Sequence, residues 1–173
     1  MALMWLCRVQ KACYWTGQPR ASVSRVARWH SGGRPILYLA ESPALATLEW
    51  EKGMMSQGLA VPEITCAELI LVEVALALPD DPLPSVDPAT LPVDWRRIPN
   101  PHSMATQVIG NAWLDRRDSL ALRVPSSALP DGAGWNVLLN AAHPEYPNEF
   151  PPERIRVTPF DLRHYLGLPS TSG

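Results

Sequence analysis

Residues 27–50 read ARWHSGGRPILYLAESPALATLEW, and this stretch organises the expected fold. Residues 31–33 predict a turn, because glycine tolerates backbone angles that other residues avoid. Residues 35–40 then predict a short, mostly buried strand, since they are apolar apart from one tyrosine. Ser42-Pro43 predicts a helix start, where serine caps free amides and proline suits the first helical position. We expect this helix to run to about Met55.

The same stretch supplies a cation (Arg28), an aromatic hydroxyl (Tyr38) and an anion (Glu49). We expect Leu45 and Leu48 to share the buried face of the helix, with Glu49 beside it. Each residue also has an ordinary structural interpretation. A strand tyrosine usually packs in the core, a helix glutamate is usually solvated, and Arg28 with Glu49 can form a plain ion pair.

Composition predicts one globular domain over residues 1–173, because 46% of the residues are hydrophobic and the net charge is only −2. That charge argues against a broad nucleic-acid surface. No apolar run approaches a membrane span, and the N-terminus lacks a basic start followed by an apolar signal core, so we expect a cytoplasmic protein. The three cysteines and four histidines show no CxxC or HxxxH spacing, so neither a disulfide framework nor a metal site is expected.

The remaining elements follow from local patterns. Strands are expected at residues 4–10, 66–77, 119–125 and 153–158, a short apolar segment at 135–140, a loop or short helix at 15–27, and a helix at 102–117. We expect Met104, Val108 and Trp113 to be in phase on the last helix. The tail 168–173 is expected to fray.

Residues 79–101 contain seven prolines, which exclude a regular helix or a central strand. We interpret them as an ordered surface excursion that Trp95, together with Arg96 and Arg97, pins down. Strands and helices mix without a regular βαβ rhythm, which predicts a compact α+β fold with mixed, mostly antiparallel β-sheets and flanking helices. The motifs GxGxxG, GxxxxGK[ST] and GxSxG are absent.

Several short motifs occur in an order that resembles the RES domain, from about residue 3 to about residue 160. They are Arg8, Ala27-Arg28-Trp29, Ile36-Leu37-Tyr38-Leu39-Ala40, Glu49, Leu122-Arg123-Val124-Pro125-Ser126, Leu138-Leu139-Asn140 and His143-Pro144. The chain departs from the family pattern at two places. Ala27 stands where the family usually has a glycine, and His30-Ser31 stands where an asparagine usually follows the Arg-Trp pair.

The resemblance implies a fold related to ADP-ribosyltransferases and an activity that consumes NAD⁺, without a metal. It also implies a bacterial toxin of a RES–Xre type II toxin–antitoxin pair. The implied partner is an Xre-type helix-turn-helix antitoxin that blocks the pocket. The sequence leaves the oligomeric state open; a homodimer within the toxin–antitoxin complex is one assembly that the resemblance allows.

Carried over residue by residue, the resemblance implies a catalytic set and a ligand-binding set. The catalytic set is Arg28, Tyr38, Glu49 and Ser126, and the ligand-binding set is Arg8, Arg28, Tyr38, Ser126 and Asn140. These residue types suit NAD⁺ cleavage, because a carboxylate stabilises the oxocarbenium-like cation that develops on the ribose. Arginine grips a pyrophosphate through paired hydrogen bonds, and tyrosine offers a face for stacking on the pyridinium.

Three interpretations stay open. The first is NAD⁺ breakdown by glycohydrolysis or phosphorolysis, with water or phosphate as the acceptor, which would arrest growth. The second is ADP-ribosyl transfer to a specific cellular protein. The third is a non-enzymatic module that only binds its antitoxin.

Overall fold

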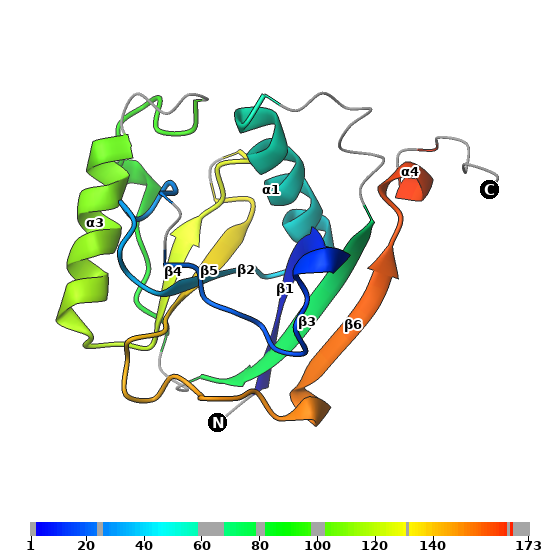
Figure 1. Cartoon of the computed structure of the whole chain (residues 1–173). Coiled ribbons are helices and arrows are strands. Elements are labelled where there is room, and N and C mark those ends of the chain that lie inside the picture. The colour runs from blue at the N-terminus through cyan, green and yellow to red at the C-terminus, as the bar shows by residue number, and fades with distance from the viewer. Residues whose placement is uncertain are drawn as a thin grey trace.

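Six strands form one sheet in the order β4-β5-β2-β1-β3-β6 (Figure 1). The computed structural model describes residues 3–23, 26–58, 68–78, 82–97, 103–130, 132–165 and 167. The strands are β1 (Leu3–Lys11), β2 (Ile36–Ala40), β3 (Leu69–Ala77), β4 (Ala121–Pro125), β5 (Trp135–Asn140) and β6 (Ile155–Phe160). Every pairing between these strands is antiparallel. The predicted α+β class with antiparallel pairing is therefore confirmed.

The helices of the described residues flank this sheet. They are α1 (Pro43–Ser56), α3 (Ser103–Arg116) and α4 (Leu162–Tyr165), with single 3₁₀ turns η1 (Ala12–Tyr14), η2 (Pro88–Thr90) and η3 (Pro152–Arg154). Helix α1 begins where predicted, because the Ser42 hydroxyl accepts a hydrogen bond from the Leu45 amide at 3.2 Å. Helix α4 was not predicted from the sequence. No helix of the described residues is long and apolar enough to cross a membrane.

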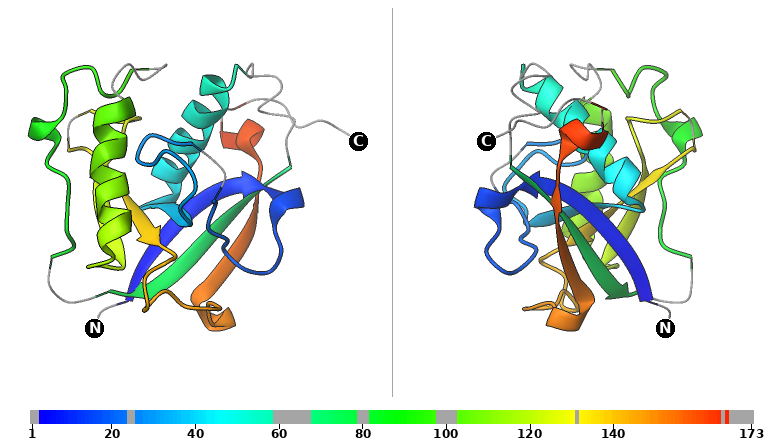
Figure 2. Two further views of the ribbon diagram at one scale, coloured as in Figure 1. Left: turned by 60° about the vertical axis from the view of Figure 1, so that its left-hand side comes forward. Right: turned by 90° about the vertical axis from the view of Figure 1, so that its right-hand side faces the viewer.

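Strand alternation assigns the two faces of the sheet. On β2, Leu37 and Leu39 belong to one core cluster, while Ile36 and Tyr38 belong to another on the opposite face. That second face carries both long helices: α1 packs over β1, and α3 packs over β4 and β5. Figures 1 and 2 show residues 26–30, the Arg28 loop, between α1 and α3. The Arg28 loop therefore passes over the middle of the sheet.

The proline-rich excursion is described over residues 82–97. Trp95 is only 2% exposed and lies 6.0 Å from Trp29, ring centre to ring centre, so the prediction that Trp95 pins this segment is confirmed. The backbone of Arg123 on β4 exchanges hydrogen bonds with residues 84 and 86 at 2.8 and 2.9 Å. The excursion thus covers the outer edge of β4.

The predicted helix faces were partly wrong. Val108 is 59% exposed, whereas the buried positions on α3 are Thr106, Gly110, Trp113 and Leu114. Of these, Thr106 and Gly110 are small and let the helix approach Arg28 and Trp29, so packing decides the face more than apolar spacing does. On α1, Leu48 is 39% exposed, and the buried residues are Leu45, Ala46 and Thr47.

Strand and loop boundaries also differ. Residues 66 and 67, and the tail 168–173, lie outside the described residues; β3 begins at Leu69. Strand β6 begins two residues later than expected, because Pro151 and Pro152 favour the 3₁₀ turn η3 in front of it. The described part of residues 15–27 is a loop and contains no helix.

Candidate active site

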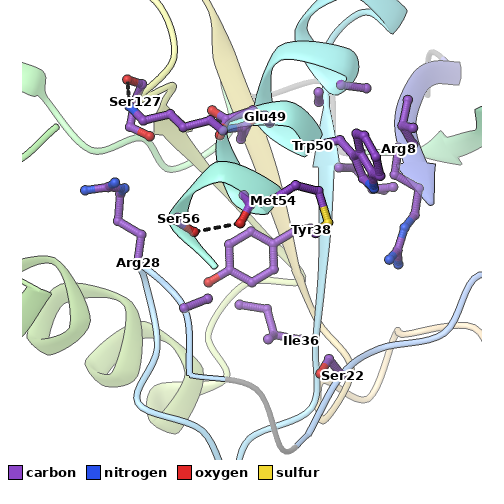
Figure 3. A pocket seen from close by; sticks show the side chains of 18 of the residues that line it. Arg8, Ser22, Arg28, Ile36, Tyr38, Glu49, Trp50, Met54, Ser56 and Ser127 are labelled. Atoms are coloured by element: carbon purple, nitrogen blue, oxygen red, sulfur yellow. Dashed lines mark hydrogen bonds between the residues drawn. The ribbon is translucent and has the colours of Figure 1, made fainter. Parts of the chain in front are cut away.

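A cavity of about 380 Å³ lies on the helix side of the sheet, beside β1, β2 and α1 and under the Arg28 loop of residues 26–30. Four predicted site residues line it: Arg8, Arg28, Tyr38 and Glu49. Figure 3 shows Arg28 and Arg8 on opposite sides, with Tyr38 between them. The structure thus brings Arg8 and three residues of the stretch 27–50 around one space.

The carboxylate of Glu49 is held by two donors from other elements. Its Oε1 accepts hydrogen bonds from Ser126 Oγ at 2.6 Å and from Asn136 Nδ2 at 2.7 Å. Ser126 follows β4 and is only 2% exposed, and Asn136 belongs to β5. Hydrogen bonds to a charged acceptor are short and strong, so this pair fixes the orientation of the carboxylate.

Arg28 lies in a loop that α3 holds in place. The Thr106 hydroxyl donates to the Arg28 carbonyl at 2.6 Å, and the Gln107 amide donates to the carbonyl of Ala27 at 2.9 Å. The Arg28 guanidinium donates to the carbonyl of Trp95 and lies 5.8 Å from the centre of that ring. The cation is therefore placed by α3 and by the proline-rich excursion.

Burial and a neighbouring carboxylate act on the charge of Arg28 in opposite directions. Burial lowers the pKa of Arg28, while the negative charge of Glu49 and that of an ionised Tyr38 oppose the decrease. An arginine stays protonated under ordinary conditions, so the cavity contains a guanidinium beside a carboxylate.

The hydroxyl of Tyr38 points to His30, with 2.9 Å between Oη and Nδ1. His30 is 1% exposed, and its ring centre lies 5.6 Å from that of Tyr38. Burial raises the pKa of Tyr38 well above its usual range, although a backbone hydrogen bond from Trp29 and the charge of Arg28 oppose this. Tyr38 therefore presents a neutral ring whose hydroxyl is tied to the Arg28 loop.

The other predicted residues are placed differently. Arg8 donates to the Arg20 carbonyl at 3.4 Å across the cavity from Arg28. Ser126 does not line the cavity and contacts Glu49 through the hydrogen bond from its Oγ to Oε1. Asn140 is not brought to this cavity: it is 1% exposed, donates to the Leu114 carbonyl at 2.9 Å and accepts from the Ala142 amide at 3.0 Å.

A family model, the RES domain, matches residues 6–162. The chain belongs to the RES domain family. The resemblance inferred from the motifs is therefore confirmed.

Relatives of this RES domain are named as toxins. "Toxin Res" of Yersinia enterocolitica serotype O:8 / biotype 1B is 31% identical over 135 residues, which cover 78% of this chain and 80% of that one. "Toxin Res" of Pseudomonas putida is 32% identical over 118 residues, covering 68% and 72%. "Prs ADP-ribosylating toxin" of Sphingobium sp. strain YBL2 is 35% identical over 121 residues, covering 68% of each chain. This RES domain is thus a member of a family of toxins.

The fold also matches a solved structure. A chain in the crystal structure of the M. tuberculosis MbcT–MbcA toxin–antitoxin complex superposes with a TM-score of 0.70 at 16% identity. The match covers 96% of this RES domain and 89% of that chain. At this identity the likeness establishes a shared fold.

Three residues of the site were missed in the sequence: His30, Lys52 and Asn136. Lys52 lies three residues after Glu49 on α1, so helical spacing was a signal that could have placed both on one side. Asn136 carried no such signal, because only the strand pairing brings it to Glu49. No group of three or more His, Cys, Asp or Glu among the described residues is arranged to hold a metal ion.

Proposed function

We propose that this RES domain cleaves the bond between nicotinamide and ribose in NAD⁺, with Glu49 as the catalytic carboxylate. The observation that carries the proposal is the double hydrogen bond from Ser126 and Asn136 to Glu49 Oε1, at the wall of a cavity that also contains Arg28. A carboxylate fixed before the ligand arrives stabilises developing positive charge without reorganisation.

The chemistry follows from the leaving group. As the C–N bond breaks, its electron pair goes to the pyridinium nitrogen, and neutral nicotinamide leaves an oxocarbenium-like cation on the ribose. Because both donors engage Oε1 of Glu49, we assign a ribose hydroxyl to Oε2. The ring of Tyr38 offers a stacking face for the pyridinium, and Arg28 offers paired donors for the pyrophosphate.

The acceptor decides between two candidate functions. Water or phosphate adding to the ribose carbon gives NAD⁺ breakdown. A nucleophilic side chain adding to the same carbon gives ADP-ribosylation of a protein, and this second candidate is supported by the relative named "Prs ADP-ribosylating toxin".

We further propose that the chain acts in the cytoplasm as the toxin of a toxin–antitoxin pair. The solved relative belongs to a toxin–antitoxin complex, which supports an antitoxin partner. The family resemblance points to an Xre-type protein that blocks the cavity.

The test is NAD⁺ consumption by purified protein, with products followed by mass. Glu49→Gln is expected to lower the rate by about 10²–10³-fold. Glu51→Gln is the matched control, because Glu51 lies on the same helix but does not line the cavity.

Each outcome has one meaning. Full turnover by folded Glu49→Gln would refute the assignment. If NAD⁺ stays intact with the wild type, a protein in cell extract that gains the mass of ADP-ribose indicates a transferase. No reaction in either experiment favours a module that only binds its antitoxin.

A further inference from the structure

Three positively charged side chains lie close together near Glu49: Arg28 and Lys52, which line the cavity, and Arg96, whose charge acts on Lys52. The guanidinium carbons of Arg28 and Arg96 lie 5.8 and 5.3 Å from the centre of the Trp95 ring. Lys52 and Arg28 both line the cavity. Sequence reasoning assigned no role to Lys52 and only an anchoring role to Arg96.

Lys52 is oriented by two backbone carbonyls. Its Nζ donates to the carbonyl of Arg96 at 3.1 Å and to that of Ser127. These acceptors belong to two different loops, one in the proline-rich excursion and one after β4. An ammonium group has three N–H donors, so one remains to point at a ligand in the cavity.

The charges around Lys52 are unbalanced. Burial lowers the pKa of Lys52, as do the charges of Arg28 and Arg96, while Glu49 opposes the decrease. These four side chains therefore carry three positive charges and one negative charge. A ligand with negative charge would relieve the repulsion among the cations.

We propose that Lys52 and Arg28 form a subsite for a phosphate group at the Glu49 end of the cavity. This inference deepens the proposed function and rests on it for the role of the subsite, since the phosphate is either the pyrophosphate of NAD⁺ or free inorganic phosphate. Binding itself requires no turnover, so it is tested separately.

A purely structural role of Lys52 makes a different prediction. If Lys52 only joins two loops, a side chain that still donates to a carbonyl should replace it. Lys52→Gln retains an N–H donor and loses the charge, so it separates the two roles. The chain has one other lysine, Lys11, at the end of β1 and outside the cavity lining, and Lys11→Gln is the matched control.

The experiment is calorimetric titration of the full chain with inorganic phosphate and with ADP at low ionic strength. We expect Lys52→Gln to bind at least one of the two probes about tenfold more weakly, as the loss of one charge-assisted hydrogen bond implies. Lys11→Gln should bind like the wild type. Weakened binding of inorganic phosphate alone indicates a subsite for free phosphate, and weakened binding of ADP alone indicates the pyrophosphate of NAD⁺.

A second measurement, by NMR, needs no variant. Labelling the lysines with ¹³C at Cε gives one signal for Lys11 and one for Lys52. Adding phosphate or ADP should shift the Lys52 signal and leave the Lys11 signal unchanged. Unchanged affinity in folded Lys52→Gln, or no binding of either probe by the wild type, would overturn the subsite. Intact binding without NAD⁺ turnover would instead leave the subsite standing and remove the proposed function.

Discussion

Asn136 and Asn140 lie on the same face of β5, four residues apart, but only Asn136 reaches the carboxylate of Glu49. The Asn136 amide donates to Oε1 at 2.7 Å. The Asn140 amide donates instead to the carbonyl of Leu114, at the end of α3. One strand therefore positions the charged group of the site at one end and anchors a helix at the other.

Replacing the two asparagines should separate activity from stability. Asn136→Ala is expected to lower kcat for NAD⁺ cleavage about tenfold or more, because Glu49 loses one of the two charge-assisted hydrogen bonds that orient it. Asn140→Ala should reduce the free energy of unfolding by about 1–3 kcal/mol, because it leaves buried backbone groups unpaired. Rates per folded molecule and urea unfolding curves measure both effects. A stable but inactive Asn140→Ala would instead favour the ligand-binding role that the resemblance implied.

The contact between His30 and Tyr38 predicts energetic coupling. His30→Leu and Tyr38→Phe should each lower kcat/KM for NAD⁺, and the double variant should lose less than the sum because the two changes remove one shared hydrogen bond. We expect a coupling energy of about 1 kcal/mol. His30→Asn should recover part of the activity, since an amide can still meet the hydroxyl. Additive losses would show that His30 acts on the cavity by another route.

Local sequence patterns correctly predicted the elements whose formation depends on residues close together in the chain. Ser42-Pro43 marked the start of α1, and the apolar run of residues 35–40 marked β2. The position of Trp95 in the proline-rich segment indicated an anchor, and the tryptophan is buried. The stretch of residues 27–50 offered Arg28, Tyr38 and Glu49 as candidates, and the resemblance implied their catalytic roles. The structure places all three around one cavity.

What the sequence did not predict depends on contacts between distant segments. Val108 was expected in phase with Trp113, but Val108 is exposed and α3 turns Thr106 and Gly110 toward the Arg28 loop, because that loop passes close to the helix. The donors to Glu49 come together only through pairing of β4 with β5. The hydrogen-bond partners of Lys52 are backbone carbonyls, and every residue has one, so the sequence cannot indicate which carbonyls Lys52 meets.

The buried thiol of Cys7 predicts a decline of stability at alkaline pH. Burial and the charge of Glu73 raise the pKa of Cys7 from 9.0 to about 11. The unfolded thiol ionises first, so the stability linked to Cys7 is present below pH 9.0 and is lost as the pH rises toward 11. The expected loss is at most about 3 kcal/mol. Unfolding free energies at intervals between these pH values should decline less in Cys7→Ala than in the wild type.

Cys13 provides the control for this prediction, because its side chain is exposed. Cys13→Ala should keep the alkaline decline of the wild type. Tyr38, whose pKa is also raised by burial, contributes a decline of the same sign to every variant, so it cancels in the comparison. Parallel curves for Cys7→Ala and the wild type would contradict the prediction.

Gly110 on α3 lies where the helix packs closely against the Arg28 loop, so a larger residue at this position tests that contact. A Cβ atom at this position would lie 1.8 Å from the carbonyl oxygen of Trp29, which is backbone and cannot rotate away. Alanine normally stabilises a helix relative to glycine by about 1 kcal/mol. Here Gly110→Ala should instead destabilise the protein by about 1–3 kcal/mol or more, through overpacking. The displaced loop also carries Arg28 and His30, so NAD⁺ turnover per folded molecule should fall as well.

Gly53 on α1 is the matched control, because a Cβ atom there meets nothing within 4 Å. Gly53→Ala should leave stability unchanged or raise it by up to about 1 kcal/mol. Urea unfolding of both variants, with NAD⁺ turnover measured under conditions where each is folded, separates the helix effect from the loop effect. If Gly110→Ala is as stable as Gly53→Ala and as active as the wild type, the loop is not held against α3, and the placement of Arg28 by this helix is wrong.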